Sequence, residues 1–204
     1  MWAATAIPAP ARAVTRHWGE AESGYRPTYG SGFRRSGDSP TPAPCFSPRS
    51  LHHATMPSAS LSSPFGPLTV TEQGGVLTEL SWRGGGTDRS ALLQEAVTQL
   101  SDYFAGQRQR FDLPLATGTG FRARFLQALI DIPYGQTREY GALARSLGVP
   151  AQAIGQACGA NCLPILIPCH RVLAANGLGG YSGSGGVETK VALLRHEGAG
   201  SLLL

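Results

Sequence analysis

The alternation of apolar and polar residues is clearest at residues 68–71 and 76–82, where β-branched side chains are frequent. A pair of glycines, Gly74 and Gly75, lies between the two runs. Two runs of this kind on either side of a double glycine predict two strands joined in a β-hairpin. We therefore expect an antiparallel pair of strands at this point of the chain.

Apolar residues then recur at helical spacing over residues 92–104 and stop before Gly106. This pattern predicts an amphipathic helix that ends at the glycine. Its aromatic residues are expected to pack in the core, as aromatic residues on a helical stripe usually do. The hairpin and this helix together predict a small α/β lobe, which we assign to residues 56–114.

Three shorter helices are predicted further along the chain. Thr119 is a suitable N-cap for a helix over residues 121–130, and Thr137 for a helix carrying residues 140–147. A glycine-containing turn then leads into a helix over residues 151–160, so the last two form a helix-turn-helix pattern. This last helix is rich in Ala and Gly, which suits either a nucleic-acid groove or close helix packing.

The end of the chain contains a glycine-rich segment, residues 179–186, and an amphipathic helix over residues 187–196. The segment lacks the GxxxxGK[ST] pattern, so we expect no nucleoside triphosphate site. The helix ends at Glu197. Taken alone, a carboxylate near a helix C-terminus is usually just solvated.

Residues 161–172 form an apolar run bounded by prolines, which predicts a buried, extended segment. The run ends on Cys169, followed by His170 and Arg171. A thiol becomes a strong nucleophile as thiolate, which a neighbouring base or cation favours and an apolar pocket opposes. On these residues alone, a structural buried cysteine explains the pattern as well as a reactive one.

Composition limits the classes of function. Residues 56–204 hold 11 basic and 10 acidic residues, so nucleic-acid binding would depend on a local basic surface and on backbone amides. The sequence has no run of about 20 apolar residues to span a membrane. Its four cysteines form no CxxC pair, so we expect neither structural zinc nor any other cofactor. We expect a cytoplasmic monomer, associated with the nucleoid, or a nuclear protein in a eukaryote.

Residues 1–55 are rich in Pro, Ser, Gly and Arg, without a sustained apolar period. Such a composition predicts a disordered leader, because it cannot bury enough apolar surface to become ordered. An alternative hypothesis is that Met56 is the true initiator and that the leader is not translated. The mass of the intact protein from its native source distinguishes the two.

Taken in order, these motifs resemble the O6-alkylguanine-DNA alkyltransferases, also called methylated-DNA–protein-cysteine S-methyltransferases. The resemblance covers about residues 65–204, and Pro168-Cys169-His170-Arg171 is its most specific motif. The other matching positions include Ile132, Pro133, Tyr134, Gly135, Tyr140, Gly155, Asn161, Gly180, Tyr181, Ser182, Gly183, Lys190, His196, Glu197 and Gly198. It implies an α/β N-terminal lobe followed by a mostly α C-terminal domain with a helix-turn-helix, the latter at residues 115–204.

The resemblance also implies a set of catalytic residues. Cys169 would accept the alkyl group from guanine O6 irreversibly, in a single turnover. His170 would take the thiol proton through a water molecule, and Glu197 would orient His170. Asn161 would tie the loop before the active site to the recognition helix. Tyr140 would donate a hydrogen bond to the departing guanine, where negative charge develops.

Recognition of the lesion is implied in the same way. The partner would be double-stranded DNA containing O6-alkylguanine, and the sequence leaves activity on O4-alkylthymine open. The target nucleotide would be flipped out of the stack, and the second helix of the helix-turn-helix would enter the minor groove. The implied lesion-binding residues are Val172, Tyr181 and Ser182, and the implied DNA-binding residues are Thr119, Ala151, Gln152 and Gly155.

Gln152 departs from the family pattern, because relatives usually have an arginine there that enters the base stack. Glutamine can still wedge and hydrogen-bond, but it brings no charge. We therefore predict weaker or more salt-tolerant DNA binding. The loop after Tyr181, which carries Ser182, is about two residues longer than usual.

An alternative function is that of a non-catalytic sensor of alkylated DNA, which would use the same helix-turn-helix. Relatives of that type have another residue in place of the acceptor cysteine. Here Cys169, His170, Asn161 and Glu197 are all retained. The complete set favours the transferase.

Overall fold

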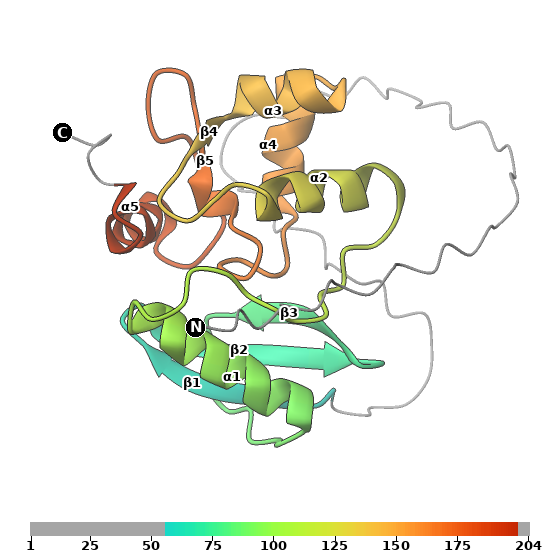
Figure 1. Ribbon diagram of the computed structural model, residues 1–204, viewed down its shortest axis with the longest axis vertical. Helices are drawn as coiled ribbons and strands as arrows, with labels where there is room; N and C mark the ends of the chain where they lie inside the picture. The colour runs from blue at the N-terminus through green and yellow to red at the C-terminus, as the bar shows by residue number, and fades with distance from the viewer. Residues whose placement is uncertain (1–55, 200–204) are drawn as a thin grey trace, which may run out of the picture. The chain divides into compact units, whose positions relative to one another are not determined.

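The structure is a computed structural model that describes residues 56–199 (Figure 1), so the predicted leader at residues 1–55 lies outside the described residues. An N-terminal lobe of a small sheet and one helix is followed by a mostly helical C-terminal part, which confirms the predicted fold class. The elements of the N-terminal lobe are β1 (Ser58–Ser63), β2 (Gly66–Gln73), β3 (Val76–Ser81) and α1 (Ala91–Phe104). The three strands form an antiparallel sheet in the order β1-β2-β3.

The predicted hairpin joins β2 and β3. Gly74 and Gly75 have φ angles of 59° and 79°, the left-handed conformation that a tight two-residue hairpin turn requires at both positions. The pattern did not predict β1, which pairs with β2 along its whole length. Four of the six residues of β1 are serine, so only Ala59 and Leu61 supply the apolar alternation that indicates a strand.

Helix α1 has the bounds that its apolar spacing predicts. The Ser90 side chain caps it by accepting a hydrogen bond from the Leu93 N–H, and Gly106 follows with φ 72°. Leu93, Leu100 and Tyr103 are fully buried. The last turn of the helix therefore brings an aromatic residue into the interior of the molecule.

The C-terminal part contains α2 (Gly120–Ile130), α3 (Tyr140–Leu147), α4 (Ala151–Gly159) and α5 (Gly186–His196). A short parallel pair, β4 (Arg138–Glu139) and β5 (Val172–Leu173), and the 3-10 turn η1 (Cys169–Arg171) complete it. Gly148 ends α3 in the left-handed conformation and turns the chain into α4, as in a helix-turn-helix. None of the helices within residues 56–199 has the length and apolarity to cross a membrane.

Two predicted helix caps differ from the structure. Thr119 occupies the N-cap position of α2, but its side chain makes no capping hydrogen bond there. Thr137 does not cap α3, which begins at Tyr140 with Glu139 as its N-cap residue. The reason is that Arg138–Glu139 is held in extended conformation by pairing with β5, which the local sequence cannot indicate.

The apolar run at residues 161–172 is buried, as predicted, but it is not extended. Ile165 has φ 73°, an uncommon conformation for a β-branched residue, and the N–H of Ile167 donates to the Leu163 carbonyl at 2.8 Å. The chain therefore folds into a compact loop. The Leu80 N–H donates to the Cys162 carbonyl at 2.8 Å, which attaches this loop to β3.

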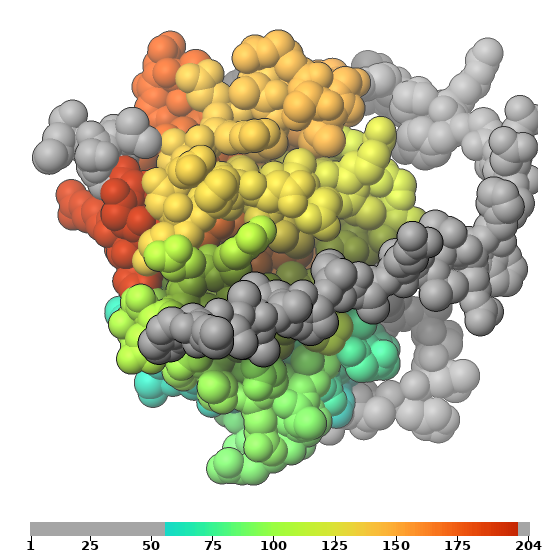
Figure 2. Space-filling view, in the orientation of Figure 1, coloured from blue at the N-terminus to red at the C-terminus, as the bar shows by residue number. Residues whose placement is uncertain are grey.

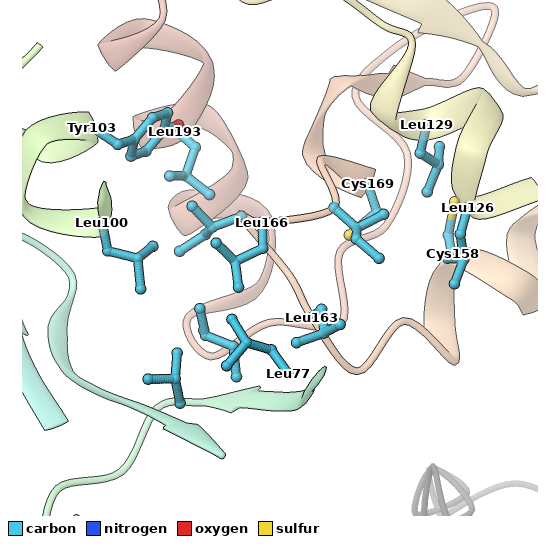
Figure 3. Packing of buried hydrophobic residues seen from close by; sticks show 14 of the residues in the cluster. Leu77, Leu100, Tyr103, Leu126, Leu129, Cys158, Leu163, Leu166, Cys169 and Leu193 are labelled. Atoms are coloured by element: carbon cyan, nitrogen blue, oxygen red, sulfur yellow. The ribbon is translucent and has the colours of Figure 1, made fainter. Parts of the chain in front are cut away.

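The core is continuous between the lobe and the helical part, which lie against one another in Figure 2. Figure 3 shows buried side chains running from Leu77 and Leu100 through Leu163 to Cys169 and Leu129. The loop that precedes Cys169 thus packs on both parts of the molecule. This packing fixes the position of the cysteine.

Candidate active site

Cys169 lies at the bottom of a pocket of about 500 Å³ and is only 3% exposed. Two parts of the chain form the walls: the consecutive helices α3 and α4, and the loop after β5. The other residues that line the pocket are Tyr140, Ala151, Gly155, Cys158, Gly159, Gly180, Tyr181 and Ser182. A pocket of this volume with a thiol at its base is suited to a small ligand.

The surroundings of Cys169 keep its thiol protonated at rest. Burial raises the pKa of the thiol, whereas a hydrogen bond from Asn161 and the charge of Lys190 lower it to a smaller extent. A buried thiol of this kind needs a base before it can act as a nucleophile.

Asn161 closes the loop that leads to the cysteine. Its side-chain N–H donates to the Ile167 carbonyl at 2.9 Å, and its side-chain oxygen accepts from the Leu163 N–H at 3.1 Å. Its backbone N–H donates to the carbonyl of Cys158, in the last turn of α4. The side chain thus closes the loop, whereas the contact with α4, which the resemblance assigns to the side chain, is made by the backbone.

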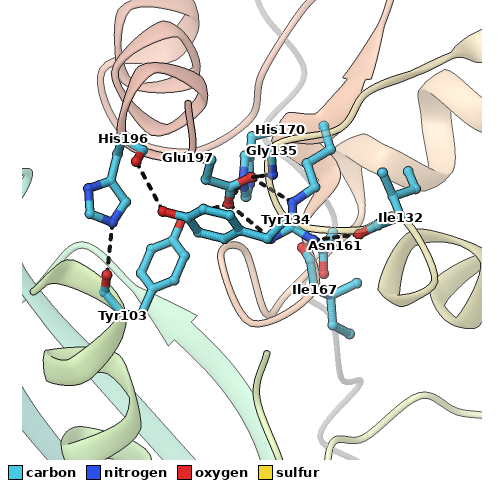
Figure 4. Close-up of polar contacts among 10 residues, drawn as sticks. Tyr103, Ile132, Tyr134, Gly135, Asn161, Ile167, His170, His196 and Glu197 are labelled. Carbon is cyan, nitrogen blue, oxygen red and sulfur yellow. Dashed lines mark hydrogen bonds and ion pairs between the residues drawn. The ribbon is translucent and has the colours of Figure 1, made fainter. Parts of the chain in front are cut away.

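His170, the next residue after the cysteine, is paired with Glu197 from the end of α5 (Figure 4). Its Nε2 lies 2.8 Å from Glu197 Oε1, and both side chains are fully buried. Arg171 donates from Nε to Oε2 at 2.8 Å and from Nη2 to Oε1 at 3.0 Å. Tyr103 donates from its hydroxyl to Oε1 at 2.7 Å. Glu197 is therefore a well-ordered acceptor at the centre of a polar network.

The charges of this network follow from its hydrogen bonds. Burial alone would raise the pKa of Glu197, but hydrogen bonds from His170 and Arg171 outweigh it and hold the pKa well below its usual range. Burial lowers the pKa of His170, against the opposing effect of Glu197. The pair is thus a carboxylate and a neutral imidazole.

This pairing assigns the roles of the two ring nitrogens of His170. A carboxylate oxygen can only accept a hydrogen bond, so the neighbouring Nε2 is the donor and carries the proton. Nδ1 then has the lone pair. Nδ1 is buried and has no hydrogen-bond partner among the described residues. It is the atom of the network that is available to accept a proton.

Two hydroxyl groups of the pocket are loosely held. The Tyr140 hydroxyl donates to the Gly180 carbonyl at 3.5 Å, and the Tyr181 hydroxyl is buried without a partner in the described part of the chain. Burial, with smaller effects of Cys158 and Cys169, raises the pKa of Tyr140 to about 12. Burial likewise raises the pKa of Tyr181. Both hydroxyls therefore remain protonated donors.

The other sequence-predicted residues lie at or near the pocket in different ways. Ala151, Gly155 and Ser182 line it, with Gln152 exposed on the first turn of α4. Val172 does not line it; this residue is fully buried in β5, and its carbonyl accepts a hydrogen bond from Lys190. Thr119 is exposed at the start of α2, outside the pocket lining.

Lys190 has a structural role that the sequence pattern did not reveal. Its ammonium group, on a fully buried side chain, donates to the carbonyls of Val172 and Leu178 at 2.6 Å and of Gly180 at 3.1 Å. It thereby joins β5 to the loop that forms one wall of the pocket. The sequence marks it in two ways, as a position that matches the family pattern and as the single lysine beside sixteen arginines, but neither indicates its partners.

Arg171 and Tyr103 were also absent from the predicted site. Arg171 follows directly after the cysteine and histidine, which marks it as near the site but does not indicate its partners. Tyr103 is 94 residues away from Glu197 in the sequence, and its spacing indicated only a core position. Helical periodicity identifies a buried face but not the polar partner that a buried hydroxyl meets.

Comparison with known proteins gives the same family for both parts of the chain. Residues 56–117 match the family described as 6-O-methylguanine DNA methyltransferase, ribonuclease-like domain. Residues 120–199 match the one described as 6-O-methylguanine DNA methyltransferase, DNA binding domain. Together these matches span almost all of the described residues.

Individual relatives belong to the same family. The methylated-DNA–protein-cysteine methyltransferase of Mycobacterium tuberculosis is 43% identical over 159 residues, which cover 72% of this chain and 92% of the relative. The constitutive enzyme of that name from Bacillus subtilis is 49% identical over 109 residues, or 52% of this chain and 66% of the relative. The crystal structure of Mycobacterium tuberculosis OGT in complex with DNA has 44% identity and a TM-score of 0.62, with 70% of this chain and 92% of that chain covered. The chain belongs to the methylated-DNA–protein-cysteine methyltransferase family.

Proposed function

We propose that the protein repairs DNA by moving the alkyl group of O6-alkylguanine onto Cys169, once per molecule and irreversibly. The observation that carries this proposal is a thiol at the base of a pocket, followed in the chain by a buried imidazole that is hydrogen-bonded to a carboxylate. Nucleophile, base and orienting group are the three parts that such a transfer needs.

In the proposed reaction, the thiol proton passes through a water molecule to Nδ1 of His170. The sulfur of Cys169 then attacks the alkyl carbon, a C–S bond forms and the bond between that carbon and guanine O6 breaks. The electron pair stays on the guanine, where negative charge develops. The hydroxyl of Tyr140 donates to this charge, which lowers the barrier. The product is a stable thioether, so the protein acts only once.

Nucleotide flipping belongs to the proposal because of where the sulfur lies. Cys169 is 3% exposed at the bottom of a pocket, so it cannot reach a base that remains stacked in a duplex. A base turned out of the helix is small enough to enter. The loosely held hydroxyls of Tyr140 and Tyr181 are then available to bind its polar edge.

We assign DNA binding to the outer face of α4. A Cβ atom added at Gly155 or Gly159 would meet no atom within 4 Å in the described part of the chain, so internal packing does not require glycine at these positions. Small residues there suit the close approach of a DNA backbone or groove. Gln152 is exposed on the first turn of the same helix, and we assign to it the role of entering the base stack. The proposed partner is double-stranded DNA with O6-alkylguanine.

The experiment that tests the proposal is the mass of the intact protein before and after incubation with a short duplex containing O6-methylguanine, followed by peptide mapping. We expect a gain of one methyl group on Cys169. The Cys158→Ser variant, which removes the second thiol of the pocket, serves as a control and should still gain the methyl group. The unmodified duplex should produce no change.

Lack of a mass gain together with tight, lesion-selective binding would contradict the transferase and favour the sensor. A second duplex containing O4-methylthymine measures the range of substrates in the same assay. Methylation that mapped to Cys158 instead of Cys169 would also contradict the assigned nucleophile.

A further inference from the structure

The N-terminal lobe contributes a side chain to the polar network beneath the cysteine. Tyr103 lies in the last turn of α1 and is fully buried. Its hydroxyl donates to Glu197 Oε1 at 2.7 Å, the same oxygen that lies 2.8 Å from His170 Nε2 (Figure 4). One carboxylate oxygen thus contacts both His170, the proposed base in the C-terminal part, and Tyr103 of the N-terminal lobe.

A second contact holds the same two segments together. His196, the residue before Glu197, directs its Nε2 to the backbone carbonyl of Tyr103 at 2.8 Å, and its ring lies 5.0 Å from the Tyr103 ring. The Tyr134 hydroxyl donates to the His196 carbonyl at 3.0 Å. The end of α5, which carries Glu197, is therefore attached to the end of α1 through both side chain and backbone.

We propose that Tyr103 is a positioning residue of the acid–base pair: its hydroxyl, supplied by the N-terminal lobe, holds Glu197 Oε1 in place and takes part of the carboxylate charge away from His170. This gives the lobe a role in the chemistry. The inference deepens the proposed function, on which its kinetic part rests.

The hydroxyl is suited to this role because it stays protonated. Burial raises the pKa of Tyr103 strongly, and the nearby charge of Glu197 raises it further. A donor that does not ionise withdraws the same share of charge from Oε1 at every pH at which the protein is folded. The carboxylate is then a weaker acceptor for the histidine proton than it would be alone.

Loss of the Tyr103 hydroxyl should change the pKa of His170 in one direction only. Without the hydroxyl, more of the Oε1 charge acts on His170, the imidazolium is favoured and the pKa of His170 rises. The base is then protonated, and inactive, at a higher pH. Other groups that face His170 and Glu197 are unchanged: Arg171 and Lys190, which both lower the pKa of His170, the Tyr134 hydroxyl, and the Gly135 N–H, which donates to Glu197 Oε2 at 3.4 Å.

The test uses Tyr103→Phe, which removes the hydroxyl and keeps the ring, in the full chain. Tyr134→Phe is the matched control, because it removes a hydroxyl from the same region that bonds to the His196 carbonyl and not to the carboxylate. The tautomer and pKa of His170 are followed by NMR of the labelled imidazole. The rate of methyl transfer in a single turnover is measured across the acid limb of its pH profile.

We expect the pKa of His170 to rise by about half a unit to one unit in Tyr103→Phe and to stay within about 0.2 units in Tyr134→Phe. Transfer on the acid limb should fall up to about tenfold, with less than a threefold change on the plateau. Replacing Tyr103 with 3-fluorotyrosine, a stronger donor, should shift the pKa in the opposite direction while retaining the ring.

An unchanged pKa of His170 in both Tyr103 variants would overturn the proposal. An equal rise in Tyr103→Phe and Tyr134→Phe would overturn it too, because it would indicate general loosening of the region. If the wild-type protein transferred no methyl group, the proposed function would fail, but the NMR titration would still decide the role of Tyr103.

Discussion

The base and the mouth of the Cys169 pocket are built in opposite ways. At the base, His170, Arg171 and Glu197 are buried, and Glu197 accepts hydrogen bonds on both of its oxygens. At the mouth, Tyr140 and Tyr181 are partly exposed; the Tyr140 hydroxyl has a long contact with Gly180 and a hydrogen bond with Cys158, and the Tyr181 hydroxyl has no partner in the described residues. The carboxylate at the bottom of the pocket is thus held by several short hydrogen bonds, whereas the hydroxyls at the mouth are held weakly or not at all.

This difference corresponds to what each region does in the proposed reaction. A base and its orienting group work best when neighbouring contacts already hold them in position. Groups that recognise a ligand must instead have hydrogen-bonding capacity left for it. Changes at the base should therefore affect stability and chemistry together, whereas changes at the mouth should affect the reaction or DNA binding alone.

The largest effect on stability and on methyl transfer is expected from Glu197→Gln, at the bottom of the pocket. This change leaves the buried Arg171 guanidinium without its counter-charge, which should lower the free energy of unfolding by about 3–5 kcal/mol. It should also abolish most of the transfer, because His170 loses its orienting carboxylate. Denaturant unfolding measures the first effect. Glu188→Gln, an exposed change on the same helix, should alter stability by less than about 0.5 kcal/mol.

The next largest effect on stability is expected from Lys190, which joins β5 to the loop that forms one wall of the pocket. Lys190→Met keeps an unbranched side chain only one atom shorter but removes three hydrogen bonds to carbonyls, so we expect a loss of about 1–3 kcal/mol of stability. Faster amide exchange in residues 178–182 would show that the wall of the pocket has loosened. Arg195→Met, at an exposed position of α5, is the control. Equal exchange in both variants would count against the role of Lys190.

At the mouth, Tyr140→Phe should separate chemistry from stability. The hydroxyl makes a long contact of 3.5 Å to the Gly180 carbonyl and a hydrogen bond to the Cys158 thiol, a weak partner, so the free energy of unfolding should change by less than about 1 kcal/mol. The transfer rate should fall roughly tenfold to a hundredfold, because the developing charge on guanine loses a donor. Single-turnover kinetics give the rate. A wild-type rate would remove Tyr140 from the proposed mechanism.

The smallest effect is expected at Gln152. Gln152→Arg adds a cation on the first turn of α4, which should tighten DNA binding a few-fold at low salt. The slope of the logarithm of the binding constant against the logarithm of the salt concentration should become steeper by roughly one unit. Binding titrations at several salt concentrations measure this. Gln156→Arg, an exposed change on the same helix, controls for charge alone. If Gln152→Arg changed neither affinity nor repair rate, a role of this position in DNA binding would be contradicted.

The sequence by itself determined the elements whose signals are local. The double glycine predicted the hairpin, helical spacing predicted α1, and both were confirmed because turns and amphipathic helices depend on residues a few positions apart. The motif around Cys169 indicated the family, which the comparisons show. The resemblance to that family also named the histidine and the glutamate, which the structure brings to 2.8 Å of each other.

Only the tertiary structure decided the start of α3 and the conformation of the loop before Cys169. Helix α3 begins late because β4 pairs with a strand more than thirty residues further on, from Arg138 to Val172. The loop turns at Ile165 instead of extending. In both cases distant packing overrides the local preference, which is a weak guide when the competing contacts are buried.

The tertiary structure alone also decided the partners of the buried polar groups. Glu197 meets Arg171 across 26 residues and Tyr103 across 94, and Lys190 meets the Val172 carbonyl across 18. A local pattern would place a lysine or a glutamate in solvent and a helical tyrosine in an apolar core. A polar group can remain buried only where the fold supplies its partner, and the sequence around that group does not record which partner it will meet.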